Sequence, residues 1–248
     1  MHIFLCAKMV PVYKSSDPSV LNNYRPNSLL SLFSKLLERL MCNKLMKYID
    51  LNSILYQHQY GFRSKHSTIH PIVHFLNDCA KANNKLPNEL TLATYINLSK
   101  AFDTISSNIL LYKLNCYGIR GIVNRWLESY LKNRTQYVSI NSHDSHHLPL
   151  TCGVPQGSIL GPLLFLIYIN DIPKSTEASI LSFADDTTVC ISDSDTTILF
   201  DKSNKCLNDV FNWFGANKLA MNAHKTKYMI VHPPNKKLNL DKHNLNIY

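Results

Sequence analysis

The sequence contains no long apolar segment, no closely spaced pair of cysteines and comparatively few acidic residues. No stretch approaches the roughly 20 apolar residues that a membrane-spanning helix needs, and the apolar run at the start is too short for a secretory signal. We therefore expect an intracellular protein without a membrane partner. The seven cysteines lie far apart with no Cys-x-x-Cys pair, which excludes the usual zinc-binding spacing and favours reduced, mostly buried thiols.

What the sequence does contain is an excess of positive charge on a chain long enough for a large core. The 248 residues are 45% hydrophobic and carry 26 Lys and Arg against 17 Asp and Glu, a net charge of +9. So basic a balance favours a polyanionic partner such as nucleic acid. Residues 1–90 hold 11 basic and 5 acidic side chains, whereas residues 91–248 hold 15 and 12. The first region therefore has the charge expected of the basic wall of a groove.

Apolar spacing predicts helices and short strands in alternation, which is typical of an α+β domain. The stretch that begins at Ser28 predicts an amphipathic helix with Leu32, Leu36 and Leu40 on its apolar face and Glu38 opposite. The other patterns predict helices after Ser67, at 108–117, at 122–132, from Gly161 and around 207–214, and strands at 90–96, 136–140 and 228–231, with a hairpin over 179–192.

The sharpest local pattern is the pair of adjacent acids Asp185 and Asp186 between two β-prone runs. It predicts a hairpin with two carboxylates at its tip. Neighbouring anions repel one another, so a cation should neutralise them, and Mg²⁺ prefers carboxylate oxygens. Two such ions would activate a hydroxyl and stabilise a leaving oxygen in phosphoryl transfer. Taken alone, however, the dipeptide more often marks an ordinary solvated turn.

The acids are part of a series of motifs that follow one another along the chain. The series is Tyr24-Arg25-Pro26 with Ser28-Leu29-Leu30-Ser31, Gln59-Tyr60-Gly61-Phe62-Arg63 with Ser67-Thr68, Leu98-Ser99-Lys100-Ala101-Phe102-Asp103, Gly153-Val154-Pro155-Gln156-Gly157-Ser158, Phe183-Ala184-Asp185-Asp186, and Asn217-Lys218-Leu219 with Lys225-Thr226. Together these motifs resemble the reverse transcriptase domain of non-LTR retrotransposons, the jockey and CR1-like class of LINE elements, over nearly the whole length. Each motif alone is weak, but the series in this order is specific.

The resemblance implies an α+β right-hand polymerase, whose palm is a small antiparallel sheet backed by helices. We expect fingers over 1–90 and a palm over 91–232, with 119–150 returning to the fingers and a polar tail at 233–248. No thumb and no endonuclease domain are evident, so we interpret the chain as a fragment. The implied reaction is DNA synthesis from deoxynucleoside triphosphates on an RNA template and a DNA primer, with two Mg²⁺ ions, or Mn²⁺ in their place. The oligomeric state stays open.

The resemblance also implies roles for side chains around the acids. Arg63 is expected on the incoming triphosphate, because a guanidinium makes paired bonds to phosphate oxygens. Phe102 matches the ring that crowds the sugar 2′ position and so favours deoxyribose. Gln156 and Gly157 resemble the turn under the nascent base pair, and Lys225 the lysine proposed to protonate the leaving pyrophosphate. The ordinary alternatives are a surface arginine, a core phenylalanine and a solvated lysine.

One departure from the family pattern concerns the metal site. The family carries a third catalytic aspartate on the strand before Leu98, and this chain has Asn97 at that position. An amide oxygen can coordinate a metal but brings no negative charge, so two carboxylates remain. We therefore expect synthesis to be impaired or absent. The alternatives are a catalytically dead nucleic-acid-binding remnant and, with less support, a group II intron maturase-like protein or a telomerase subunit.

Overall fold

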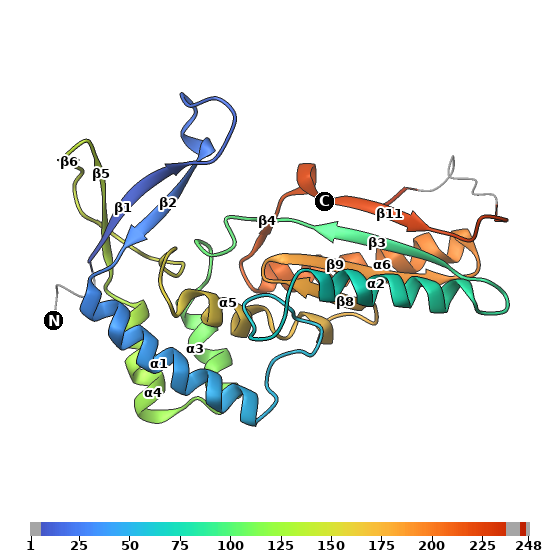
Figure 1. Ribbon diagram of the computed structural model, residues 1–248, viewed down its shortest axis with the longest axis horizontal. Helices are drawn as coiled ribbons and strands as arrows, with labels where there is room; N and C mark the ends of the chain where they lie inside the picture. Colours follow the sequence, from blue (N-terminus) through green and yellow to red (C-terminus); the bar gives the residue numbers. More distant parts are fainter. Residues whose placement is uncertain (1–5, 237–243, 247–248) are drawn as a thin grey trace. The chain divides into compact units, whose positions relative to one another are not determined.

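In a computed structural model that describes residues 6–236 and 244–246, contacts within the chain divide it into two compact units (Figure 1). The first unit combines the chain up to Ile54 with Phe102–Tyr168, and the second combines Leu55–Ala101 with the chain from Ile169 onward. Each unit is therefore assembled from segments that are distant in the sequence.

The predicted boundaries of fingers and palm come from the family resemblance, whereas the two compact units come from contacts within the chain. The fingers and palm therefore stay a prediction. Of the predicted polar tail, residues 237–243 and 247–248 lie outside the described residues. In the part of the chain that the structure describes, no helix combines the length and the apolar character that crossing a membrane requires.

The first unit contains a mixed sheet whose strands are ordered β2-β1-β5-β6, with β7 also paired to β5. The strands are β1 (Cys6–Tyr13), β2 (Tyr24–Leu29), β5 (Thr135–Ile140), β6 (His143–Asp144) and β7 (Leu148–Pro149). Strand β1 runs antiparallel to β2 and parallel to β5. Strand β5 confirms the strand predicted at 136–140, whereas the sequence patterns predict neither β1 nor β2.

The helices of the first unit other than α1 begin within one residue of their predicted positions. The helices of this unit are α1 (Leu32–Leu51), α3 (Ser107–Cys116), α4 (Gly121–Leu131) and α5 (Gly161–Ile169), the last of which ends at the boundary between the units. Helix α5 is buried on nearly all sides, as a helix that is apolar all round should be. This confirms the buried helix predicted from Gly161.

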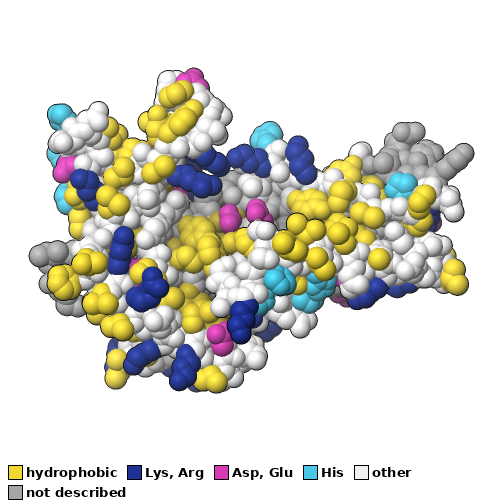
Figure 2. All heavy atoms as spheres, in the orientation of Figure 1, with side chains coloured by type: hydrophobic (Ala, Val, Ile, Leu, Met, Phe, Trp, Pro, Cys, Tyr) yellow, Lys and Arg dark blue, Asp and Glu magenta, His cyan; other side chains and the backbone are white. Residues whose placement is uncertain are grey.

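Helix α1, however, exposes leucines of the predicted apolar face and buries Glu38 of the opposite face. Leu32 and Leu36, expected in the core, are 81% and 56% exposed. Glu38, expected outside, is 1% exposed, and its carboxylate accepts hydrogen bonds from the Tyr130 hydroxyl (3.0 Å) and the Ile159 N–H (2.7 Å). The predicted face is wrong because these tertiary bonds, which no periodicity reveals, hold Glu38 inside. Figure 2 accordingly shows hydrophobic and basic side chains interspersed on the surface where α1 lies.

The same helix also begins later than its pattern predicts. Ser28, the predicted start, is paired with Met9 in the sheet. The helix begins only at Leu32, because Ser31 caps it by accepting a hydrogen bond from the N–H of Ser34 (3.2 Å). The leucines before this cap therefore belong to the strand and its connection rather than to the helix.

The second unit is built on an antiparallel sheet with the strand order β11-β3-β9-β8. Its strands are β3 (Leu90–Ile96), β8 (Ser179–Phe183), β9 (Asp186–Asp193) and β11 (Lys227–Val231), and a short separate pair joins β4 (Leu98–Ser99) to β10 (Ala220–Met221). These strands confirm the predicted strands at 90–96 and 228–231 and the predicted hairpin.

Helices α2 (Ile69–Asn83) and α6 (Thr196–Ala216) cover this sheet (Figure 1). Phe75 of α2 packs against Ala93 and Cys190, which are paired positions of β3 and β9. Helix α6 contacts the same two strands and buries Leu207 completely. Every position of β3 except Tyr95 is buried. The predicted small antiparallel sheet backed by helices is therefore present in this unit.

Candidate active site

The two adjacent acids lie at the tip of the hairpin that β8 and β9 form. Phe183 pairs with Asp186 across the hairpin, so Ala184 and Asp185 make the connection between the strands. Ala184 has a φ of +56°, the left-handed conformation that a two-residue hairpin requires at its first central position. Asp185 is half-buried and Asp186 exposed. The fold therefore presents two carboxylates side by side at one end of the sheet.

The environment of Asp186 disfavours its charged form. Partial removal from water raises the pKa of Asp186, and the neighbouring charge of Asp185 raises it further. A cation bound between the two carboxylates would reverse both effects, because it stabilises the ionised form of each. The two carboxylates could therefore bind a hard cation, because such cations prefer carboxylate oxygens as ligands.

Asn97 follows directly after β3, the strand that pairs with β9. Strand β3 pairs with β9 as far as Ile96 and Thr187, and one more step in the same register would put Asn97 opposite Asp186. The backbone of Asn97 is held on its other side, where its C=O accepts a hydrogen bond from the N–H of Asn222 (2.8 Å). Among the described residues, no three His, Cys, Asp or Glu side chains are grouped so that they could hold a metal ion. That Asn97 takes the third position beside the acids stays a prediction.

Lys225 lies in the turn that follows Asn222. This turn is a single 3-10 turn (η4, Ala223–Lys225), capped by the Asn222 side chain, which accepts a hydrogen bond from the N–H of Lys225 (3.3 Å). The Lys225 side chain is exposed. Because Asn222 bonds both Asn97 and Lys225, the structure joins the turn with the lysine to the end of β3. All these residues belong to the second unit.

Arg63 is half-buried, and its side chain is hydrogen-bonded to the backbone of the preceding loop. One guanidinium nitrogen, Nη1, donates hydrogen bonds to the backbone carbonyls of Tyr56 and Gln59, each at 3.1 Å. The simple alternative of an unattached surface arginine therefore does not describe this residue. The same bonds hold the loop that precedes α2, which lies beside strand β8: the N–H of Tyr60 donates to the carbonyl of Ser182 (2.8 Å).

The other predicted nucleotide-binding residues lie in the first unit. The Phe102 ring is half-buried and stacks on Phe165 of α5, with ring centres 4.7 Å apart. Gln156 donates its amide to both carboxylate oxygens of Asp103 (2.9 and 3.1 Å). Gly157 has a φ of +94°, and a Cβ there would come within 2.6 Å of the Asn27 side chain, so only glycine fits without strain. Phe102, Gln156 and Gly157 are thus parts of one packed region.

Sequence reasoning did not identify the roles of Asp103 and Gln59. Asp103 is bonded to Gln156, and the only signal for it is its place at the end of the motif Leu98–Asp103. Gln59 is 4% exposed, although glutamine is a residue typical of surfaces. Its place at the start of the motif Gln59–Arg63 is again the only signal, and it carries no information about what the side chain touches.

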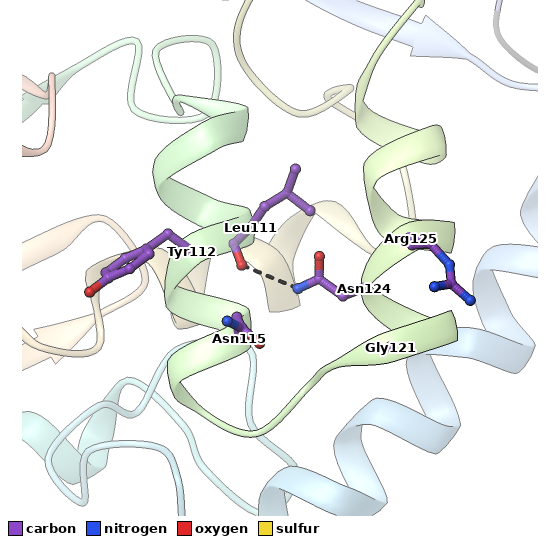
Figure 3. A pocket seen from close by; sticks show the side chains of 6 residues that line it. All are labelled: Leu111, Tyr112, Asn115, Gly121, Asn124 and Arg125. Carbon is purple, nitrogen blue, oxygen red and sulfur yellow. Dashed lines mark hydrogen bonds between the residues drawn. The ribbon is translucent and has the colours of Figure 1, made fainter.

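A pocket of about 440 Å³ lies between α3 and α4 (Figure 3). It is lined by Leu111, Tyr112, Asn115, Gly121, Asn124 and Arg125. The Asn124 amide donates to the carbonyls of Leu111 (3.2 Å) and Ile119 (3.0 Å), so it joins the two helices. Arg125 points away from the other side chains in Figure 3. Because none of the predicted site residues lines this pocket, the hairpin tip is the better candidate for chemistry.

Comparison with known sequences gives one family. The profile described as "Reverse transcriptase (RNA-dependent DNA polymerase)" matches residues 12–244. The RNA-directed DNA polymerase from mobile element jockey of Drosophila melanogaster is 32% identical over 195 residues, which cover 74% of this chain and 21% of that protein. The probable RNA-directed DNA polymerase from transposon BS of the same species is 34% identical over 174 residues, covering 67% and 18%. The chain thus spans about a fifth of the length of the curated relatives it matches.

Solved structures show the fold. Telomerase from Candida tropicalis in complex with a TWJ fragment of telomeric RNA matches 96% of this chain and 43% of its own, with a TM-score of 0.67 and 16% identity. Apo telomerase from the same species, truncated from the C-terminal domain, matches 94% and 51% with a TM-score of 0.64 and 14% identity. These neighbours confirm the predicted α+β right-hand polymerase fold.

Proposed function

The chain belongs to the reverse transcriptase (RNA-dependent DNA polymerase) family, and on that premise we propose that it is a non-LTR retrotransposon polymerase domain whose own catalysis is impaired. The observation that carries the proposal is the hairpin tip. Asp185 and Asp186 form a pair of carboxylates there, and the pairing of β3 with β9 ends at Ile96 and Thr187, the residues next to Asn97 and Asp186, which supports a place for the neutral Asn97 beside the acids.

The groups that would hold divalent cations are the carboxylates of Asp185 and Asp186 and the side-chain oxygen of Asn97. Members of this family use divalent metal ions, and we propose two Mg²⁺, with Mn²⁺ as an alternative. Oxygen donors of this kind fit such ions. When bound, the ions activate the primer hydroxyl and stabilise the leaving oxygen in phosphoryl transfer. The raised pKa of Asp186 supports this assignment, because the two acids are costly as bare neighbouring anions.

The remaining site residues are proposed to bind and orient the nucleotide. Arg63 keeps its loop in place through Nη1 and offers its other N–H groups to the triphosphate. The Phe102 ring, fixed by stacking on Phe165, excludes a 2′ hydroxyl. Gln156 and Gly157 support the nascent base pair, and the exposed Lys225 delivers a proton to the pyrophosphate.

We propose that the partners are an RNA template, a DNA primer and deoxynucleoside triphosphates. The fingers region 1–90 carries more of the basic excess than the palm region 91–232, and we assign 119–150 to the fingers as well. Basic side chains bind the template and primer through their phosphates, without reading sequence.

Asn97 is the reason for expecting weak catalysis. An amide replaces a carboxylate beside the other two, so the site loses one negative charge for holding cations. Because positioning and charge stabilisation account for most of the catalysis in phosphoryl transfer, the loss should cost on the order of 100-fold in rate or more.

A primer extension assay with an RNA template and Mg²⁺ tests this proposal. We expect little synthesis by the unaltered chain and an increase of roughly 100-fold in Asn97→Asp. Asn115→Asp, on the exposed side of α3, adds the same charge away from β3 and should change nothing. Robust synthesis by the unaltered chain would refute the impairment, and no synthesis by Asn97→Asp would refute the proposal of a polymerase domain that Asn97 alone impairs.

The neutral Asn97 also favours a second candidate function, a nucleic-acid-binding remnant without catalysis. The two candidates are separated by filter binding over a series of salt concentrations together with the extension assay. Binding that weakens steeply with salt, in a chain that stays inactive as Asn97→Asp, would favour the remnant.

A further inference from the structure

The loop that carries Gln59 is joined to the catalytic hairpin as if it were one more strand. Gln59 forms a parallel bridge with Ser182 of β8, and the backbone bonds on either side run from Ser182 N–H to the carbonyl of His58 (3.0 Å) and from Tyr60 N–H to the carbonyl of Ser182 (2.8 Å). The sheet that ends in the two acids therefore has a neighbour on its β8 edge.

The side chain of Gln59 brackets one residue of the hairpin tip. Its Oε1 accepts a hydrogen bond from the Ala184 N–H (3.0 Å), and its Nε2 donates to the Ala184 carbonyl (3.3 Å). The same Oε1 also accepts from the N–H of Gly61 (2.8 Å). One buried amide thus satisfies both backbone polar groups of the residue that immediately precedes Asp185.

Ala184 is the residue in the hairpin that most needs support. Its φ of +56° is a conformation that alanine adopts reluctantly, and its side chain is 6% exposed. Gly61 allows the loop to come this close, because a Cβ on Gly61 would lie 2.1 Å from the Ala184 nitrogen. The hydrogen bond from Arg63 Nη1 to the carbonyl of Gln59 (3.1 Å) also holds the loop.

From these contacts we propose that Gln59 is a positioning residue: it fixes Ala184 in its left-handed conformation and thereby sets the direction in which Asp185 and Asp186 leave the hairpin. The hydrogen bonds of its side chain go to the backbone of Ala184 and Gly61, so it acts through the backbone. The part of this inference that concerns catalysis rests on the proposed function, whereas the part that concerns the hairpin does not.

The test compares Gln59→Met with Gln57→Met. Methionine keeps the length of the side chain and removes the amide, and Gln57 is an exposed glutamine on the same loop. Two measurements need no activity: hydrogen exchange of the backbone around Ala184, and Mn²⁺ affinity from the resonance signal of free Mn²⁺. We expect Gln59→Met to speed exchange at the tip at least tenfold and to weaken Mn²⁺ binding roughly tenfold, with no change in Gln57→Met. Unchanged exchange and affinity in Gln59→Met would overturn the proposal.

A second variant guards against loss of folding. Glycine adopts the left-handed conformation readily, so Ala184→Gly should make the hairpin less dependent on Gln59. We expect the Mn²⁺ penalty of Gln59→Met to shrink to about threefold or less in the Ala184→Gly background. If Gln59→Met does not fold alone, the double variant should recover folding. A penalty that stays the same, or a double variant that does not fold, would count against the proposal.

Activity gives the third measurement. In the Asn97→Asp chain, Gln59→Met should lower kcat roughly tenfold and leave the KM for template-primer unchanged, since it moves the acids and not the binding groove. A rise in KM with unchanged kcat would contradict a role in positioning the acids. If Asn97→Asp makes no DNA, the proposed function fails, while exchange and Mn²⁺ binding still decide the role of Gln59.

Discussion

Strand β3 of the second unit and helix α1 of the first enclose their apolar side chains to different degrees. In the second unit, strand β3 is buried at every position except Tyr95, and α2 and α6 contact it. In the first unit, helix α1 leaves Leu32 and Leu36 largely exposed and buries the carboxylate of Glu38. An apolar stripe therefore predicts that a helix or strand forms, but the partners that pack on it decide which side is buried.

The largest effect on the free energy of unfolding is expected from truncating a leucine in the second unit, compared with a leucine in the first. Leu92 of β3 is fully buried, so Leu92→Ala should lower the free energy of unfolding by about 2–5 kcal/mol. Leu36→Ala on α1 should change it by less than about 0.5 kcal/mol. Urea denaturation followed by circular dichroism measures both. Equal losses would mean that α1 is packed as tightly as β3, and the contrast between these two elements would disappear.

The second prediction concerns the buried acid of the first unit. Glu38→Leu should lower the free energy of unfolding by about 3 kcal/mol, because it removes the acceptor of two hydrogen bonds, from the Tyr130 hydroxyl and from the Ile159 N–H. Glu128→Leu, which removes only a surface pair with Lys132, should cost about 1 kcal/mol or less. The same denaturation experiment compares them, and a Glu38→Leu variant as stable as Glu128→Leu would show that the bonds of Glu38 contribute little.

The last prediction concerns the rate at which the cysteine thiols are alkylated, and it requires no substitution. Cys116 and Cys152 of the first unit are exposed, whereas Cys79, Cys190 and Cys206 of the second are buried. The expectation of mostly buried thiols therefore holds for the second unit only. Burial raises the pKa of Cys190 to about 12, and because the thiolate is the reactive form, alkylation there is slow at neutral pH.

Mass spectrometry after brief alkylation at pH 8 should find Cys116 and Cys152 modified at least about 100-fold faster than Cys190. In concentrated urea the difference should vanish, which serves as the control. Rapid modification of Cys190 in the folded protein would mean that the second unit opens easily, the reverse of the comparison drawn above.

Prediction from sequence succeeded where neighbours in the chain decide the structure. The hairpin around Asp185 and Asp186 follows from two β-prone runs separated by a short connection, and strand β3 follows from a bounded apolar run. Helix α1 follows from its apolar spacing, although its buried face does not. The prediction that Asn97 belongs beside the acids stays a prediction about function, and the register of β3 and β9 is compatible with it.

The rest depends on contacts between residues far apart in the sequence. Gln59 and Ala184 are bonded through side chain and backbone, and no periodicity links two such positions. Asp103 similarly meets Gln156 only because two connecting segments pack together. Strands β1 and β5 pair in parallel and come from the two separate segments of the first unit, so neither strand reveals its partner.

The alternation of segments between the units has a consequence for the order in which they form during synthesis. The whole of the first unit precedes Ile169, so its last segment is made before the final strand of the second. Strand β3, made early, acquires β11 only near the end of the described chain. Until then one edge of β3 lacks its partner, and an open strand edge is a template for pairing with other chains. Synthesis interrupted between Ile169 and β11 therefore releases a chain with a complete first unit and an unfinished sheet, which is the form most prone to aggregate.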